Sequence, residues 1–237
     1  RRGYAEALQG GGIGILYLTV FAALRLYALL PPAGAFALLV GIVAASVLLA
    51  LLQGSLALAV LGVTGGFLAP ILTSTGSGNH VLLFSYYALL NAGILAIAWF
   101  RSWRLLNLVG FVFTFVIGSW WGYRYYQPAL LATTEPFLVL FLLMYVAIAV
   151  LFAFRQKPEL RGYVDGTLVF GVPIVAALLQ AALVRDIEYG LAWSAFTLGL
   201  FYLVLATALF KRAPQTARTL VEAFLALGVM PTNRRWV

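Results

Sequence analysis

Residues 119–128, SWWGYRYYQP, hold the densest group of side chains in this chain that could bind a ligand. Five aromatic residues surround Arg124 there, and Glu135 follows across a short loop. Tryptophan and tyrosine rings stack on sugars and lipid head groups, and a guanidinium binds phosphate. With the single histidine, the candidate ligand-binding residues are Trp120, Trp121, Tyr123, Arg124, Tyr126, Glu135 and His80. The alternative interpretation, an aromatic belt at the head-group level of a membrane, explains the aromatic residues without any ligand.

His80 ends the stretch TGGFLAPILTSTGSGNH, residues 64–80, which separates two apolar runs. One interpretation is an interfacial histidine that caps or hydrogen-bonds the polar loop before it. The other is a pH-sensing or acid–base residue, because histidine changes charge near neutral pH. No nucleophile and acid accompany it in sequence, which favours the first interpretation.

The remaining polar side chains exclude several kinds of chemistry. All seven acidic residues fall in predicted loops or within a turn of a predicted helix end, so none forms a proton relay inside the membrane. Without cysteine and with one histidine, the chain lacks the ligands for a structural zinc or a bis-imidazole haem. Asn91 and Gln180 fall within apolar runs, and we expect them to hydrogen-bond neighbouring helices. We therefore expect no catalytic residue, no cofactor and no metal site.

The elements that must position these residues are transmembrane helices. Of the 237 residues, 64% are hydrophobic and 9% are charged, and the mean hydropathy is +1.02. An ordinary soluble domain is about half apolar and about a quarter charged. Too few polar side chains remain to coat a soluble globule of this size, so most of the outer surface must face lipid.

Eight apolar runs are close to the roughly 20 residues that cross a bilayer core. They cover residues 10–30, 34–52, 55–72, 81–100, 104–122, 135–154, 167–184 and 191–210. A ninth run, residues 219–230, is too short to span, and we expect it to lie at the interface or to be truncated. The sequence predicts an all-α polytopic transmembrane helical bundle, with residues 1–237 forming a single domain.

Local patterns refine the ends of these runs. The segment LLQGSL, residues 51–56, predicts a very tight turn between the second and third spans. Gly65, Gly66 and Pro70 predict a weakened end of the third helix. Thr134, followed by an acid and a proline, predicts the N-cap of the sixth span.

The basic residues predict the orientation. Ten of the fifteen Lys and Arg residues fall on one side if the eight spans alternate. By the positive-inside rule that side is cytoplasmic, which places residues 73–80 and 123–134 in the periplasm of a cell inner-membrane protein. The net charge of +8 thus reflects topology and contact with anionic lipids, not a nucleic-acid-binding face.

Long ordered segments of the chain resemble one known family. The segments GGFLAPILTSTGSGNHVLLFSYYALLNAGILAIAWFRSWRLLNLVGFVFTF, EPFLVLFLLMYVAIAVLFA, DGTLVFGVPIVAALLQAALV and EYGLAWSAFTLGLFYLVLA look like the predicted bacterial inner-membrane proteins of the domain of unknown function 2339 family. The resemblance covers about residues 10–228 and implies a multi-pass protein without an established activity, in a family whose members have many more spans. Where the resemblance implies an apolar continuation, this chain has MPTNRRWV, so it resembles a truncated or partial member.

Three functions are compatible with these observations. The first, which we favour, is a non-catalytic scaffold or accessory subunit of a bacterial envelope assembly, with membrane-protein partners or further copies of itself. The second is a transporter or flippase-like binder of a lipid or envelope glycan, which would use the aromatic residues around Arg124. The third is a membrane-embedded transferase on lipid-linked substrates. Such enzymes resemble one another in having an acidic residue in the first outward loop. That loop is LPPAG here and has no acidic residue, so this function is disfavoured. Membrane lipids are expected partners in each case, and nucleic acid in none.

Overall fold

The computed structural model describes residues 2–73, 79–101, 103–155, 167–210 and 218–229, and these ranges contain helices and no strand. The elements are α1 (Arg2–Arg25), α2 (Pro32–Gln53), α3 (Leu56–Thr73), α4 (His80–Phe100), α5 (Arg104–Tyr125), η1 (Pro128–Leu130), α6 (Leu131–Arg155), η2 (Thr167–Gly171), α8 (Val172–Leu183), α9 (Gly190–Phe210) and α10 (Arg218–Val229). The predicted all-α helical bundle is confirmed.

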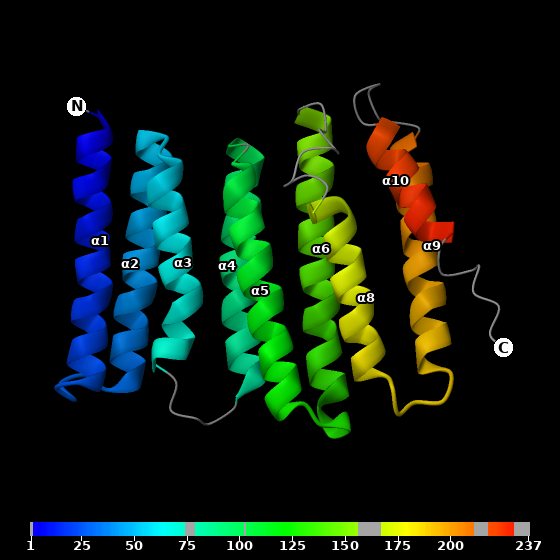
Figure 1. Cartoon of the computed structure of the whole chain (residues 1–237), viewed down its shortest axis with the longest axis horizontal. Helices are drawn as coiled ribbons and strands as arrows, with labels where there is room; N and C mark the ends of the chain where they lie inside the picture. Colours follow the sequence, from blue (N-terminus) through cyan, green and yellow to red (C-terminus); the bar gives the residue numbers. More distant parts are fainter. Residues whose placement is uncertain (1, 74–78, 102, 156–166, 211–217, 230–237) are drawn as a thin grey trace.

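The helices stand side by side in a row, with α1 at one edge and α9 with α10 at the other (Figure 1). Successive long helices run antiparallel, so the start of α1 lies at the same end as the junctions between α2 and α3 and between α4 and α5 (Figure 1). We call this end the basic end, because Arg101, Arg104 and Arg155 lie at helix termini there. The opposite end, where α5 finishes at Tyr125, is the aromatic end.

Six of the described helices are long and apolar enough to cross a membrane: α1, α2, α4, α5, α6 and α9. The two other predicted spans correspond to shorter apolar helices, 56–72 and 167–183. At 1.5 Å per residue each is about 25 Å long, slightly less than the roughly 30 Å of a hydrocarbon core. The row therefore has eight antiparallel apolar segments, two of which are short.

The turn predicted at LLQGSL is confirmed. Gly54 adopts φ 64°, ψ 30° after the last residue of α2, a left-handed conformation that glycine takes without strain. The N–H of Ser55 bonds the Ala50 carbonyl at 2.9 Å, and the Ser55 hydroxyl lies 3.5 Å from the N–H of Leu58 in the first turn of α3. A two-residue turn closed in this way brings α2 and α3 together along their whole length.

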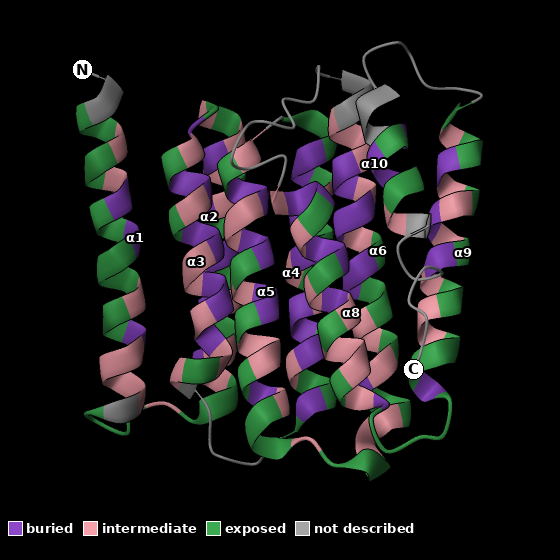
Figure 2. Ribbon diagram, turned by 45° about the vertical axis from the view of Figure 1, so that its right-hand side comes forward, coloured by how far each residue is buried: buried purple, intermediate pink, exposed green. Residues whose placement is uncertain are grey.

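The centre of the row is the best-buried part of the protein. In the apolar windows of α4 and α5, 39% of the residues are buried, against 11% in α1 and 17% in α9. Figure 2 shows the same gradient, with buried residues concentrated on the inner faces of the central helices. Because the outer faces are apolar, they suit a hydrocarbon environment. The two edge helices expose the most apolar surface.

Helix α3 continues through Pro70 to Thr73, so the glycines and the proline do not break it. Pro70 has no N–H, and the Gly66 carbonyl four residues earlier therefore lacks its usual helical donor. The hydroxyl of Tyr86, on α4, donates to the Gly66 carbonyl oxygen at 3.0 Å. The hydroxyl of Tyr87 donates to the next carbonyl, that of Phe67, at 2.9 Å.

A third tyrosine reaches α3 from the other side. Tyr17 of α1 donates its hydroxyl to the Gly62 carbonyl oxygen at 3.0 Å. A Cβ atom on Gly65 would lie 2.1 Å from the Tyr17 ring, and one on Gly62 would lie 2.6 Å from Ser46 Cβ of α2. The glycines of α3 thus let α1 and α2 approach its backbone closely, as small residues do between membrane helices.

The sixth span starts earlier than predicted. Thr134 is not its N-cap, because α6 already begins at Leu131, directly after the 3-10 turn η1. Pro128 occupies the first position of that turn, where its fixed φ favours helix initiation. Pro136 consequently lies inside α6, and the Thr134 hydroxyl is buried without a hydrogen-bond partner among the described residues.

The ninth run forms α10, a helix of 12 residues, too short to span. It lies alongside the half of α9 nearest the basic end (Figure 1). Phe224 of α10 is almost wholly buried, and its ring centroid lies 5.3 Å from that of Tyr202 on α9. Helix α10 therefore packs against a membrane helix, a contact that the sequence did not predict.

We expect Tyr86→Phe to lower the free energy of unfolding by about 0.5–1.5 kcal/mol, because the Gly66 carbonyl loses its donor. In a Pro70→Ala background the loss should be smaller, since residue 70 then supplies the helical N–H. Thermal unfolding in detergent, followed by circular dichroism, checks both. Tyr202→Phe is the control and should not destabilise, because the Tyr202 hydroxyl is buried and finds no partner among the residues that the structure describes. Equal losses in the two backgrounds would contradict this assignment.

Candidate functional site

The most central polar group lies between α4, α5 and α6. Asn91 of α4 is fully buried, and its amide nitrogen donates to the Tyr87 carbonyl and to the Thr114 hydroxyl of α5, both at 2.9 Å. Its amide oxygen accepts a 2.6 Å hydrogen bond from the Tyr145 hydroxyl of α6. The prediction that Asn91 bonds neighbouring helices is confirmed. Its hydrogen-bonding groups join three helices and present nothing to a ligand.

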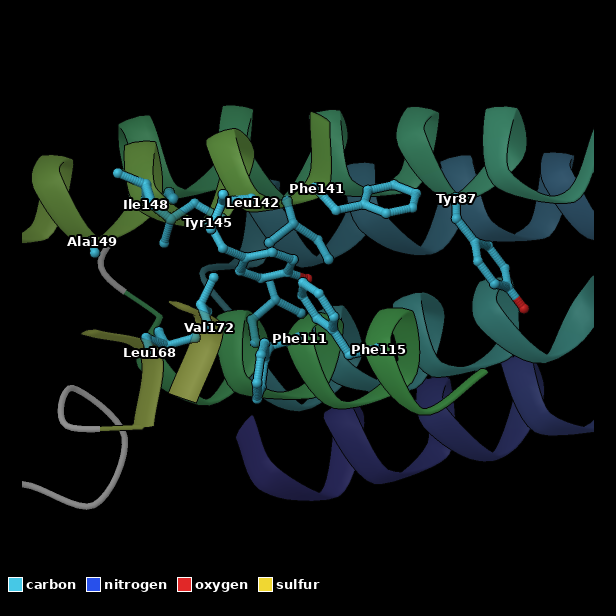
Figure 3. Packing of buried hydrophobic residues seen from close by; sticks show 14 of the residues in the cluster. Tyr87, Phe111, Phe115, Phe141, Leu142, Tyr145, Ile148, Ala149, Leu168 and Val172 are labelled. Carbon is cyan, nitrogen blue, oxygen red and sulfur yellow. The ribbon is translucent and has the colours of Figure 1, made fainter. Parts of the chain in front are cut away.

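Aromatic side chains enclose this cluster. The Tyr145 ring lies 5.8 Å from Phe111 and 5.9 Å from Phe115, both of α5, and Figure 3 shows these rings together with the aliphatic side chains around them. Gly110 makes room for the hydroxyl, because a Cβ atom there would lie 2.7 Å from the Tyr145 oxygen. The cluster is therefore sealed within the apolar core.

His80 lies at the aromatic end of the same three helices. It is the first residue of α4, whose N-cap is Asn79. Its Nε2 atom lies 2.8 Å from the Thr133 hydroxyl of α6, and its ring centroid lies 4.9 Å from that of Trp121 on α5. Trp121 is only 5% exposed, and its indole N–H has no partner among the described residues. The geometry ties the start of α4 to α5 and α6.

Glu135 belongs to a second polar group, on the other side of α6. The amide nitrogen of Gln180, on α8, donates to the Glu135 carboxylate at 2.5 Å and lies 3.2 Å from the Ser194 hydroxyl of α9. The prediction that Gln180 bonds neighbouring helices is confirmed. One amide thus links α6, α8 and α9 near the aromatic end.

Tyr126 stands beside that group. Its hydroxyl donates to the Leu183 carbonyl at 2.8 Å, one of the last carbonyls of α8, which have no helical donor. Burial raises the pKa of the Tyr126 phenol, the carboxylates of Asp186 and Glu135 raise it further, and Arg185 opposes them. Arg185 and Asp186 form an exposed pair at 3.4 Å.

The remaining candidates do not join either group. Trp120 and Arg124 are exposed, and Tyr123 is 84% exposed. The structure therefore separates the sequence-predicted set into three: His80 with Trp121, Tyr126 with Glu135, and the outward-facing Trp120, Tyr123 and Arg124. Exposed rings at a helix end match an aromatic belt. Among the described residues, no three His, Cys, Asp or Glu side chains are grouped as metal ligands would be.

The helical geometry agrees with a comparison of the sequence with known families. A family model described as "Predicted membrane protein (DUF2339)" matches residues 1–232. The chain belongs to this family. The match covers nearly all of the 237 residues given, and the family description names no activity. No curated protein and no solved structure matches the chain.

Sequence reasoning missed the tyrosines that bond inside the DUF2339 bundle: Tyr17, Tyr86, Tyr87 and Tyr145. A signal was present, because a phenolic hydroxyl placed within an apolar run needs a partner when it is buried. The hydrogen-bond partner of each tyrosine could not be predicted from the sequence, because each bonded oxygen lies 20 or more residues away in the chain.

We expect Asn91→Leu to lower the free energy of unfolding by about 1–2 kcal/mol, because it leaves the Thr114 and Tyr145 hydroxyls without partners in hydrocarbon. Asn107→Leu is the matched control: Asn107 is equally buried on α5, but its amide nitrogen has no hydrogen-bond partner in the described parts of the chain. Unfolding in detergent should show the larger loss for Asn91. A larger loss for Asn107 would refute the role given to the cluster.

The raised pKa of Tyr126 predicts a pH dependence with a definite sign. Since the folded state favours the neutral phenol, the stability from Tyr126 is fully present below about pH 10, the ordinary tyrosine pKa, and is lost as pH rises through the higher folded-state value. The melting-temperature difference between the wild type and Tyr126→Phe should therefore shrink between pH 9 and pH 12. A difference that grows with pH would show the opposite shift.

Proposed function

We propose that this protein is a non-catalytic scaffold or accessory subunit of an assembly in the bacterial inner membrane. The observation that carries the proposal is a set of exposed glycines on α1. Gly11, Gly12 and Gly14 are exposed, and a Cβ atom on any of them would meet nothing within 4 Å. Each glycine inside a helix is unfavourable by about 1 kcal/mol relative to alanine. Nothing in the described fold requires glycine at these three positions.

A partner helix would explain this set. Small residues let membrane helices approach until their backbones pack, and this protein already uses glycine in that way at Gly10, where a Cβ atom would lie 2.8 Å from Leu61 of α3. Helix α1 also stands at the edge of the row and is the least-buried span. These facts support a close contact between α1 and a helix of another protein or of a second copy.

The internal polar contacts support a structural role as well. Asn91, Thr114 and Tyr145 hydrogen-bond one another, and Gln180 bonds Glu135 and Ser194. Side chains engaged in this way stabilise a fixed arrangement of helices. A fixed arrangement suits a protein that holds partners in place.

The orientation is part of the proposal. Arg101, Arg104 and Arg155 lie at helix termini of the basic end, and the positive-inside rule makes that end cytoplasmic. The segments 73–80 and 123–134 then face the periplasm.

A second candidate function, a carrier of a lipid or envelope glycan, is favoured by the group of Tyr126, Glu135, Gln180 and Ser194. These polar groups gather near exposed aromatic rings, a combination that suits sugar hydroxyls. The group is bonded internally, so a ligand would have to replace those bonds.

We expect Gly14→Leu to leave the protein folded and to remove its stoichiometric partner, whether another protein or a second copy, because the new side chain occupies the contact surface. Native mass spectrometry of protein extracted gently from its own membrane measures the complex. Thr197→Leu, an exposed change on α9, is the control and should keep the partner.

Two outcomes would go against the scaffold. One is a wild-type protein with no protein partner and no self-association; the other is a complex that survives Gly14→Leu unchanged. A retained glycolipid that Glu135→Ala removes would instead support the carrier.

A further inference from the structure

Two neighbouring helix junctions at the basic end form a small cationic surface. Helix α4 ends at Phe100 and α5 begins at Arg104, so Arg101 and Arg104 both stand at the α4–α5 junction. A Cβ atom on Gly54, in the turn between α2 and α3, would lie 3.9 Å from the Arg101 Nη2 atom. The Arg101 guanidinium therefore reaches from its own junction to the α2–α3 turn, which lies at the same end of the row (Figure 1). We call Arg101, Arg104 and the turn at Gly54 the arginine surface.

The two arginines of this surface are held differently. Arg104 is half-buried and its Nε atom is covered by protein, so its guanidinium is held against the helices. Arg101 is exposed, and it forms no salt bridge with any carboxylate in the described parts of the chain. A cation without a neighbouring acid creates a positive potential that attracts a negatively charged ligand.

Apolar side chains stand directly beside these charges. Phe100, the last residue of α4, is exposed, and so are Leu105 in the first turn of α5 and Leu52 in the last turn of α2. In a membrane-spanning bundle such side chains contact acyl chains, while arginines at the helix ends extend to the head groups. A soluble acidic partner would match the charges but not the apolar side chains next to them. A ligand with a negative head and apolar chains matches both.

We propose that the arginine surface binds one anionic phospholipid, with its phosphate on Arg101 and Arg104 and its acyl chains against the exposed apolar side chains of these helix ends. Guanidinium groups suit this role because their N–H donors bond phosphate oxygens in pairs. An acyl chain gains little free energy by leaving the bilayer for an apolar protein surface, so selectivity comes from the charge of the head group. The site is independent of the partner surface on α1. A lipid bound there links the α2–α3 turn to the α4–α5 junction.

The test is native mass spectrometry of the purified chain with phosphatidylglycerol or with phosphatidylcholine carrying the same acyl chains. We expect one phosphatidylglycerol per chain to be retained in preference to phosphatidylcholine, whose head group has no net charge. Arg101→Gln should weaken phosphatidylglycerol retention about fivefold, the effect of one basic residue near an anionic lipid. The exposed Arg101 side chain has no salt bridge to lose among the described residues, so this variant should fold normally.

Arg124→Gln is the matched control. Arg124 is also an exposed arginine near exposed aromatic rings, but it lies at the aromatic end. The variant has the same loss of charge and should retain phosphatidylglycerol as the wild type does. Glycerol 3-phosphate, a soluble phosphate without acyl chains, should not displace the bound lipid.

Four results would overturn the proposal. The first two are equal retention of the two lipids and equal weakening by Arg101→Gln and Arg124→Gln, which would show that no specific site exists. The third is displacement of the lipid by glycerol 3-phosphate, which would show a site for free phosphate. The fourth is a protein partner, not a lipid, that Arg101→Gln removes.

Discussion

A carbonyl oxygen inside a bilayer needs a hydrogen-bond donor from the protein, and Pro70 deprives the Gly66 carbonyl of its own. The Tyr86 hydroxyl supplies the missing donor from α4. The neighbouring bonds from Tyr87 and Tyr17 make α3 the helix on which α1 and α4 are held, while its glycines admit α2. Other polar bonds continue the row: Asn91 joins α4 to α5 and α6, and Gln180 joins α6 to α8 and α9. The order of the bundle thus depends on a few internal hydrogen bonds placed between apolar faces.

The small number of these hydrogen bonds, and their position between helices, bears on the function of the protein. In lipid, apolar surfaces of neighbouring helices gain little free energy from association, so polar bonds and close backbone contacts must fix the arrangement. Here the buried side chains of Tyr86, Tyr87, Asn91, Thr114 and Tyr145 serve that purpose. What the fold leaves available lies on its outside: the exposed glycines of α1 and the rings at the aromatic end. Surfaces of this kind bind other helices and lipids, which is why we favour a scaffold over an enzyme.

The sequence was sufficient for the class of fold and for much of its layout. Hydropathy and run length predicted the helices, Gly54 marked the turn between α2 and α3, and the polar type of Asn91 and Gln180 predicted bonds between helices. Spacing along a helix tells which face a residue occupies, but not which carbonyl its hydroxyl reaches. For that reason the sequence around Pro70 predicted a weak helix end, although the Tyr86 hydroxyl replaces the hydrogen-bond donor that the proline lacks. The cluster around Arg124 also read as one surface, although helix α5 turns its members in different directions.

The polar groups between α4, α5 and α6 are sealed from water and hold the three helices together. Hydrogen–deuterium exchange in lipid nanodiscs, followed by mass spectrometry, tests this arrangement most directly, because backbone amides exchange only where water reaches them. We expect residues 86–94 and 107–115 to exchange as slowly as the lipid-facing middle parts of α1 and α9, which water does not reach. Exchange in these central segments that is clearly faster than in the middle of α1 and α9 would show that water enters between the helices, and would contradict a sealed scaffold in favour of a hydrated path.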